Sequence, residues 1–413
     1  MTIDDKILLA QLNELGAVGK TSAGGRTRLA LSDADKAGRD LVTGWMRELD
    51  LEIRIDRIGN IFGILNPELP GDGRKPALSP VMVGSHIDTV ANAGMLDGCY
   101  GVLSGLAVVR AIRQSSRKLR RPLVVAAFTN EEGVRYQPDM VGSLVYCGGY
   151  SLEEALNAAG TDGSRFGDEL ERIGYAGDLE PGSMVPKAYI ELHVEQGPVL
   201  DAEKLDIGVV ENLQGISWQK ITVRGTANHA GTTPTDMRRD AGCAAAQILL
   251  RLRELALESG TTRVTVGTMA FEPNQINVIP GQAVFTIDLR DPDEGVLCAA
   301  EARVASLLEE TARKESVEIA AERLVRFQPV AFDPELVGLI ESEAERAGFS
   351  RRRMTSGAGH DAQMMARICP TAMIFVPSRD GISHNPAEYT DEKQLIRGTR
   401  LLAAVVERCL DAE

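Results

Sequence analysis

The chain has 413 residues, of which 44% are hydrophobic and 25% are charged, and its formal net charge is -14. This length exceeds the roughly 250–300 residues that one hydrophobic core sustains, so we expect two domains. The negative charge disfavours nucleic acid and anionic membranes as partners, and no apolar run reaches the roughly 18 residues that would indicate a membrane span.

The beginning of the chain and its cysteines favour a cytoplasmic protein. Residues 1–6 include acidic side chains where a signal peptide carries basic ones. The six cysteines are scattered without a Cys-x-x-Cys pair, so neither a disulfide framework nor a thiolate zinc site is indicated. We therefore expect buried free thiols.

Short apolar runs followed by polar clusters predict buried strands of an α/β sheet. The expected strands occupy residues 80–83, 123–128 and 372–376, and the expected helices residues 103–112 and 362–367. The polar clusters stand at the carboxyl ends of the strands, where open α/β sheets bind their ligands. Residues 71–76 predict an ordinary turn-rich loop.

From residue 212 to residue 327 the pattern changes to strand, helix, strand, strand, helix, strand. The pieces are residues 217–225, 239–258, 263–271, 283–291, 294–314 and 317–327. This order is that of a ferredoxin-like α+β domain. Because polar clusters occur on both sides of it, we predict that residues 212–327 are inserted into one larger domain made of residues 1–211 and 328–413.

All five histidines stand in polar clusters rather than on apolar faces. They are His86, His193, His229, His360 and His384. Neutral imidazole is the commonest metal ligand, so this distribution favours a metalloenzyme. A single loop histidine is more often a solvated surface residue, and the prediction therefore depends on the whole set.

Carboxylates accompany these histidines. Asp88 follows His86 by two residues and can orient its ring, while Asp97 lies in a loop that can return to the same point. Glu131 and Glu132 follow an apolar run, so one can bind a metal while the other addresses a water. Alone, such a glutamate pair is more often a solvated surface pair.

Together these side chains could hold two divalent ions that share a carboxylate. The ligand set is His86, Asp97, Glu132, His193 and His384. Mixed imidazole and carboxylate ligands suit zinc, manganese, cobalt or nickel better than calcium or magnesium.

Seven motifs then make a resemblance specific. They are Gly84-Ser85-His86-Ile87-Asp88-Thr89, Gly94-x-x-Asp97-Gly98-x-x-Gly101, Thr129-Asn130-Glu131-Glu132-Gly133, His193-Val194-Glu195-Gln196-Gly197-Pro198, Gly225-x-x-Asn228-His229-Ala230-Gly231, Ser356-Gly357-Ala358-Gly359-His360-Asp361-Ala362 and Ser383-His384-Asn385-Pro386. In this order, over nearly the whole chain, they resemble the hydantoinase/carbamoylase amidases. These are dinuclear-metal hydrolases of the aminoacylase and carboxypeptidase-like group.

The resemblance implies a fold and a ligand assignment. The fold is an α/β hydrolase domain with a mixed sheet and a dinuclear metal centre, into which a ferredoxin-like α+β dimerisation domain is inserted. One metal is implied at His86, Asp97 and His193, and the other at Asp97, Glu132 and His384, with Asp97 bridging.

The resemblance also implies roles for neighbouring residues. Glu131 is the general base, Asp88 is the partner of His86, and the peptide between Asp97 and Gly98 is cis. His193 favours the amidase branch, because peptidases of the wider group usually have a carboxylate at this position.

The implied substrate contacts come from both parts of the chain. His229 would donate to the developing oxyanion from the partner subunit, and Asn277 and Arg290 would clamp the α-carboxylate of the substrate. The remaining implied substrate residues are Gln196, Gly359 and His360. Taken singly, Arg290 would be assigned to a surface salt bridge, His229 to a turn, and His360 to support of its loop.

We therefore expect a cytoplasmic homodimeric amidohydrolase that cleaves the ureido C–N bond of an N-carbamoyl-L-amino acid, giving the amino acid, ammonia and carbon dioxide. The nearest alternative is an allantoate or ureidoglycolate amidohydrolase. A dipeptidase or aminoacylase is disfavoured by His193, and a non-catalytic binding protein by Glu131, since binding alone needs no general base.

Overall fold

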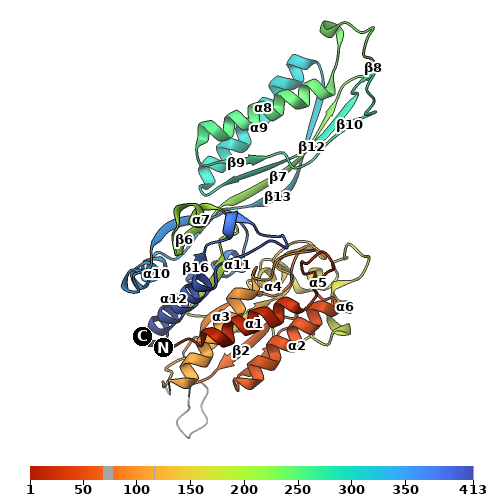
Figure 1. Ribbon diagram of the computed structural model, residues 1–413. Helices are drawn as coiled ribbons and strands as arrows, with labels where there is room; N and C mark the ends of the chain where they lie inside the picture. The colour runs from red at the N-terminus through yellow and green to blue at the C-terminus, as the bar shows by residue number, and fades with distance from the viewer. Residues whose placement is uncertain (68–77, 116, 413) are drawn as a thin grey trace. The chain divides into compact units, whose positions relative to one another are not determined.

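The structure is a computed structural model that describes residues 1–67, 78–115 and 117–412 (Figure 1). The chain forms two compact units: unit 1 is Met1–Glu211 with Phe332–Glu413, and unit 2 is Asn212–Ala331. The second boundary thus falls after residue 331, where the sequence placed it after residue 327. The loop predicted at residues 71–76 lies outside the described residues.

Unit 1 is built on a mixed sheet with strand order β1-β2-β4-β3-β5-β16-β6, and β15 also pairs with β6. The strands are β1 (Glu52–Ile55), β2 (Ile61–Leu65), β3 (Val81–His86), β4 (Leu123–Phe128), β5 (Ala188–Val194), β6 (Ile207–Leu213), β15 (Arg351–Ser356) and β16 (Thr371–Val376). Strands β4, β3, β5 and β16 are mutually parallel. Their carboxyl ends therefore meet at one edge of the sheet.

These four parallel strands are buried along their whole length. Strands covered on both faces read as continuous apolar runs, which explains why the three apolar runs in the sequence correctly predicted β3, β4 and β16.

Helices cover both faces of this sheet. The helices of unit 1 are α1 (Asp5–Ala17), α2 (Asp33–Glu48), α3 (Cys99–Gln114), α4 (Val141–Tyr146), α5 (Leu152–Leu156), α6 (Phe166–Arg172), α7 (Val199–Glu203), α10 (Pro334–Arg346), α11 (Asp361–Met365) and α12 (Glu392–Asp411). Helices α3 and α12 pack on β3 and β5, with α1 beside α3 and α10 beside α12. A Cβ on Gly101 would lie 2.5 Å from the backbone oxygen of Leu192, so only glycine lets α3 approach β5 this closely.

Unit 2 has an antiparallel sheet with strand order β10-β12-β7-β13, and β9 also pairs with β12. Its elements are β7 (Gly215–Arg224), α8 (Ala241–Ser259), β9 (Arg263–Thr265), β10 (Met269–Glu272), β12 (Gln282–Asp291), α9 (Glu294–Glu315) and β13 (Glu318–Phe327). This is the ferredoxin-like arrangement expected from the sequence. The strand predicted at residues 263–271 is divided into β9 and β10 by an interval that contains Gly267, and glycine weakens a strand interior.

Alternation along β12 separates the two faces of this sheet. Ala283, Phe285, Ile287 and Leu289 are buried in a core with residues of α8 and α9. The intervening residues of β12 are partly exposed. They belong to the face turned away from both helices, which we call the open face.

Short strands complete unit 2. Strand β8 (Asn228–His229) pairs with β11 (Val278–Ile279), beyond the ends of β7 and β12. Strand β14 (Val330–Ala331) pairs with Asn212 and Leu213 at the end of β6. In the part of the chain that the structure describes, no helix combines the length and apolarity needed to cross a bilayer, and all six cysteines are free.

Helix α2 contains a fully buried ion pair, Arg39 with Asp35, whose removal by mutation would test its contribution to the stability of unit 1. Arg39 Nε donates to Asp35 Oδ2 at 2.7 Å, and the Arg39 guanidinium also donates to the backbone oxygen of Gly59 at 2.7 Å. We expect Arg39→Ala to lower the free energy of unfolding by about 3–5 kcal/mol, because it leaves the Asp35 carboxylate buried without its cation. Urea denaturation measures this change.

The matched control is Lys36→Ala on the same helix. Lys36 and Asp40 form a pair at the same spacing, but both side chains are substantially exposed. Removal of an exposed pair should change the free energy of unfolding by less than about 1 kcal/mol. Equal losses in the two variants would contradict the assignment of the buried pair.

Candidate metal centre and active site

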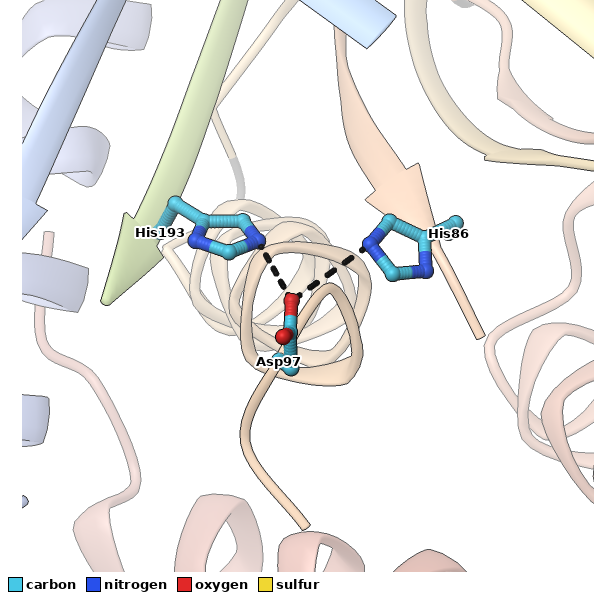
Figure 2. Close-up of side chains that lie close together, drawn as sticks. All are labelled: His86, Asp97 and His193. Carbon is cyan, nitrogen blue, oxygen red and sulfur yellow. Dashed lines mark ion pairs between the residues drawn. The ribbon is translucent and has the colours of Figure 1, made fainter. Parts of the chain in front are cut away.

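Asp97 lies between two groups of imidazole and carboxylate side chains. Its Oδ1 is 3.2 Å from His193 Nε2 and 3.6 Å from His86 Nε2 (Figure 2). Its Oδ2 is 3.1 Å from His384 Nε2, which lies 3.4 Å from Glu132 Oε2. Two groups of potential metal ligands therefore share Asp97, and within each group the ligand atoms lie within 4.8 Å of one another.

The sheet edge and its loops bring these side chains together. His86 is the last residue of β3, and His193 lies near the end of the adjacent parallel strand β5. Asp97 and Gly98 immediately precede α3. Glu132 follows β4 in the loop to α4, and His384 follows β16. The sequence prediction of a polar cluster at the carboxyl ends of parallel strands is thus confirmed.

The two buried imidazoles have the orientation that metal ligation requires. His86 Nδ1 lies 3.1 Å from the backbone oxygen of Asp88, and His193 Nδ1 lies 2.8 Å from that of Val194. A carbonyl can only accept, so each Nδ1 carries a proton and Nε2, the nitrogen that faces Asp97, is the atom left to bind a metal.

Asp88 holds the loop that carries both glutamates. Its carboxylate accepts hydrogen bonds from the backbone N–H of Glu131 at 3.2 Å and of Glu132 at 3.3 Å. The nearest approach of this carboxylate to His86 Nδ1 is 3.8 Å. The ring of His86 is therefore oriented mainly by the Asp88 backbone oxygen, while the Asp88 side chain fixes the glutamates.

Glu131 points into the same cluster, with Oε2 at 3.4 Å from His86 Nε2. Burial raises the pKa of the Glu131 carboxyl well above its usual range, against the opposing effect of His86. At Asp97 burial acts in the same direction, but hydrogen bonds from His193, His384 and His86 hold the pKa of that carboxyl well below its usual range. The two carboxylates thus differ in basicity, as a base and a permanent ligand should.

Gln196 shows that the residues present fit a cation. Its Nε2 donates to Asp97 Oδ2 at 2.8 Å. Its Oε1 is buried and has no hydrogen-bond partner among the residues described. A buried carbonyl oxygen left in this way is costly unless a ligand, ion or water meets it. With the nitrogen and oxygen donors around it, this orphan oxygen fits a centre completed by bound divalent metal.

The peptide between Asp97 and Gly98 is trans, so the prediction of a cis bond here is wrong. In the described part of the chain, the cis peptides precede Pro138 and Pro273. The Asp97 carboxylate reaches both ligand groups with this trans bond. Gly98 has φ +65°, a conformation that glycine adopts freely. A Cβ on Gly98 would lie 2.4 Å from His86 Nε2, so the site also needs glycine for space.

His360 lies beside the centre rather than in the shared group. Its ring packs edge-on against His193 with 4.6 Å between centroids, and its Nε2 lies 3.0 Å from Ser356 Oγ. Burial and the neighbouring His193 hold the pKa of His360 well below its usual range, so its ring is neutral. The adjacent Gly359 is partly exposed.

His229 and Asn277 lie together in unit 2. Val278 is the β-ladder partner of His229, and the backbone oxygen of Asn277 accepts from the N–H of Ala230. His229 is exposed, and its Nδ1 accepts from the backbone N–H of Gly231 at 3.0 Å and of Thr232 at 3.2 Å. The proton of the neutral ring is therefore on Nε2, which makes His229 a hydrogen-bond donor.

Arg290 lies in the five-stranded sheet of unit 2, near the end of β12 that is remote from the separate β8–β11 pair. It pairs with Asp288 at 2.9 Å on the open face of β12. Eight residue steps separate it from Gln282, which is about 26 Å of extended strand. Asn277 precedes β11, which pairs with β8 beyond that end of β12 (Figure 1). Within one chain, Asn277 and Arg290 cannot contact the same carboxylate.

Sequence reasoning missed Glu388. This buried side chain accepts from the backbone N–H of Leu96 at 2.8 Å and of Asp97 at 3.4 Å, and from Ser383 Oγ at 3.2 Å. It thus joins the loop of Asp97 to the loop of His384. Its only sequence signal is its place four residues after His384.

Sequence reasoning also missed Glu191. Its carboxylate accepts from Ser85 Oγ at 2.6 Å and from the backbone N–H of Ala362 at 2.8 Å. It therefore connects β5 to β3 and to α11. Glu191 and His193 lie two residues apart on one strand and share a face, which the sequence could have indicated.

A mixed α/β sheet with this ligand set at its edge defines a metal-binding hydrolase. Residues 82–408 match peptidase family M20/M25/M40, and the chain belongs to this family. It is 42% identical over 392 residues to an N-carbamoyl-L-amino-acid amidohydrolase of Rhizobium meliloti, which is 95% of this chain and 93% of that protein. It is 34% identical over 401 residues to an allantoate amidohydrolase of Bacillus subtilis, covering 94% of this chain and 93% of the relative.

A solved structure agrees. The crystal structure of an amidase of the hydantoinase/carbamoylase family from Burkholderia multivorans superimposes with a TM-score of 0.95 at 40% identity, over 100% of this chain and 99% of that one. The resemblance drawn from the seven motifs is therefore confirmed, together with the mixed-sheet α/β fold.

Glu388 generates a prediction about metal affinity. We expect Glu388→Ala to weaken divalent-metal binding about 10–100-fold, because the Leu96–Asp97 backbone and Ser383 lose their common acceptor. Competition with a chromogenic chelator measures the dissociation constants of the metal. The control is Glu392→Ala, an exposed glutamate four residues further on, which should bind metal as the parent protein does. Unchanged affinity in Glu388→Ala would contradict the positioning role.

Proposed function

We propose that this chain is an amidohydrolase that cleaves the ureido C–N bond of an N-carbamoyl-L-amino acid, releasing the amino acid, ammonia and carbon dioxide. The observation that carries the proposal is His193, an imidazole 3.2 Å from the shared carboxylate of Asp97 where peptidases of the wider group usually have a carboxylate. The name and 42% identity of the Rhizobium meliloti relative support the same substrate class.

The proposed cofactor is a pair of divalent ions, zinc, manganese, cobalt or nickel. His86, Asp97 and His193 would hold one ion, and Asp97, Glu132 and His384 the other, since each oxygen of Asp97 faces a different group. When bound, such ions supply positive charge that polarises a carbonyl and acidifies water.

Two residues would assist the attack on the ureido carbon, one at the attacking water and one at the carbonyl oxygen. Glu131 takes a proton from the attacking water, a task that its raised pKa suits. His229 donates from Nε2–H to the developing oxyanion, since its Nδ1 is occupied by two backbone donors. A ureido carbonyl is a poor electrophile because two nitrogens donate into it, so both contributions are needed.

We assign binding of the substrate carboxylate to residues of two subunits. Arg290 lies at the end of the unit 2 sheet where β7 begins and β13 ends, next to both connections with unit 1. His229 and Asn277 lie beyond the opposite end of that sheet. We therefore assign Arg290 to the chain that supplies the metal ligands, and His229 with Asn277 to the partner subunit. Gln196, Gly359 and His360 complete the proposed substrate contacts.

A homodimer would form through one side of unit 2. Strand β10 is an edge strand of the sheet, and α8 packs against the neighbouring β9 and β12. Leu250 and Leu257 on α8 are 62% and 73% exposed, which is unusual for large apolar side chains. An unpaired edge strand and exposed leucines in the same unit support a two-fold dimer made through unit 2.

Allantoate or ureidoglycolate remains the alternative substrate, because each also presents a ureido group and a carboxylate. The named Bacillus subtilis relative supports this candidate at lower identity. A cytoplasmic location is part of the proposal.

The test is hydrolysis by enzyme stripped with a chelator and reloaded with manganese or zinc. We expect ammonia release from N-carbamoyl-L-amino acids to exceed that from allantoate, ureidoglycolate and N-carbamoyl-β-alanine, because the Rhizobium meliloti relative of that class is 42% identical to this chain and the allantoate amidohydrolase 34%. Stripped protein should be inactive. Full activity without metal would refute the metal-dependent mechanism, and exclusive turnover of allantoate would select the alternative.

Two variants of the metal-loaded enzyme distinguish the role of the general base from that of a metal ligand. Glu131→Gln should retain its metal and lose at least about 100-fold in kcat, since the amide keeps the shape but cannot take a proton. His193→Ala should instead lose metal, as measured by elemental analysis. Wild-type kcat in Glu131→Gln would assign the base to another residue.

Complementation tests the role of His229 across the dimer. When inactive Glu131→Gln and inactive His229→Ala proteins exchange subunits, each heterodimer should have one doubly altered site and one intact site. Random pairing therefore recovers about a quarter of wild-type activity. If His229 served its own chain, no site would be intact and no activity would return.

The matched control mixes His229→Ala with Asn277→Ala. These residues lie side by side in unit 2, so one chain supplies both to any site. Every site in the heterodimer then carries one lesion, and activity should not rise above that of the parent variants. Recovery in this mixture would contradict the shared placement of His229 and Asn277.

A further inference from the structure

The open face of unit 2 carries an apolar patch directly beside Arg290. The patch consists of Ile216 and Trp218 on β7 and Val325 and Phe327 on β13. The β-ladder register aligns Arg290 with Ile216 and Phe327, and Asp288 with Trp218 and Val325. Residues directly opposite one another in an antiparallel sheet project from the same face.

The register fixes which face this is. Leu289 and Ile287 point into the core under α8 and α9. Arg290 and Asp288 alternate with them and therefore point the other way. Trp218 remains 37% exposed on this open face, Val325 and Phe327 are partly exposed, and Ile216 is buried between them at 7%. A large aromatic ring is thus accessible one strand away from the guanidinium.

The patch stands at the distance that an amino-acid side chain spans. Neighbouring side chains across an antiparallel pair have Cβ atoms about 4.5–5.5 Å apart. The Arg290 guanidinium lies against Asp288, which is directly opposite Trp218, so the α-carbon substituent of a substrate whose carboxylate is bound there would lie beside the Trp218 ring. Asp288 keeps its charge balanced by the Arg290 guanidinium, which a substrate carboxylate would share, and a second acidic group on the substrate would find no further cation there.

We propose that Ile216, Trp218, Val325 and Phe327 form the side-chain subsite of the enzyme and select N-carbamoyl amino acids with large apolar side chains. This inference depends on the proposed function, because it takes Arg290 as the carboxylate-binding residue. Allantoate carries a second ureido group in place of an apolar side chain, and that group would lose its hydrogen bonds to water against this patch. The subsite therefore favours the carbamoyl amino acid over the alternative substrate.

The experiment measures kcat/KM for N-carbamoyl derivatives of glycine, L-alanine, L-aspartate, L-leucine and L-phenylalanine. The parent enzyme should prefer the phenylalanine derivative to the alanine derivative by about tenfold or more, with the aspartate derivative poorest. Trp218→Ala should reduce the phenylalanine-to-glycine ratio of kcat/KM about tenfold, and Val325→Ala should reduce it in the same direction. The control variant is Lys220→Ala, on the same face of β7 but two residues further from Arg290, which should keep the parental ratio.

The outcomes separate two failures. The subsite is refuted, and the proposed function stands, if the enzyme hydrolyses all five derivatives at similar kcat/KM. The same conclusion follows if Trp218→Ala lowers kcat/KM equally for the glycine and phenylalanine derivatives. If none of the five derivatives is hydrolysed while allantoate is, the proposed function fails and the subsite with it.

Discussion

The centre depends on one carboxylate facing in two directions. Each oxygen of Asp97 addresses a separate set of nitrogen donors, so an error in its orientation would disturb both sets at once. The fold restricts this orientation from several sides. Gly98 supplies the backbone conformation, the N–H of Gly98 donates to His193 Nε2, and α3 begins at the next residue.

Other buried carboxylates restrict the surrounding backbone. Asp88 binds the N–H groups of both glutamates, Glu388 binds those of Leu96 and Asp97, and Glu191 binds that of Ala362. Each accepts from backbone rather than from a lysine or arginine. Each carboxyl accepts two or more hydrogen bonds, so a few such groups can hold the loops that end a sheet. The loops at the carboxyl ends of β3, β4 and β16 are stabilised in this way.

The sequence predicted most of the fold because its signals were local or periodic. Continuous apolar runs marked β3, β4 and β16, and the order of elements marked the inserted ferredoxin-like unit. The ligand candidates also emerged, since each stands beside a strand end. The features that the sequence did not predict correctly depend on contacts between residues far apart in the chain. Glu388 and Leu96 are 292 residues apart, and no periodicity reports such a contact. The separation of Asn277 from Arg290 likewise depends on the register of β12, and the trans peptide at Gly98 is a backbone detail that the motif does not report.

The interruption of unit 1 by unit 2 has a consequence for biosynthesis. Strand β5 pairs with β16, yet residues 212–331 are made between them. At roughly 5–20 residues per second, β5 is exposed as an unpaired apolar edge on the ribosome for on the order of ten seconds. Unit 2 is continuous and can fold during that interval, whereas the cluster around Asp97 gains His384 only when nearly the whole polypeptide has been translated. The nascent chain should therefore be most prone to aggregate, and most dependent on chaperones, between the emergence of β5 and that of β16.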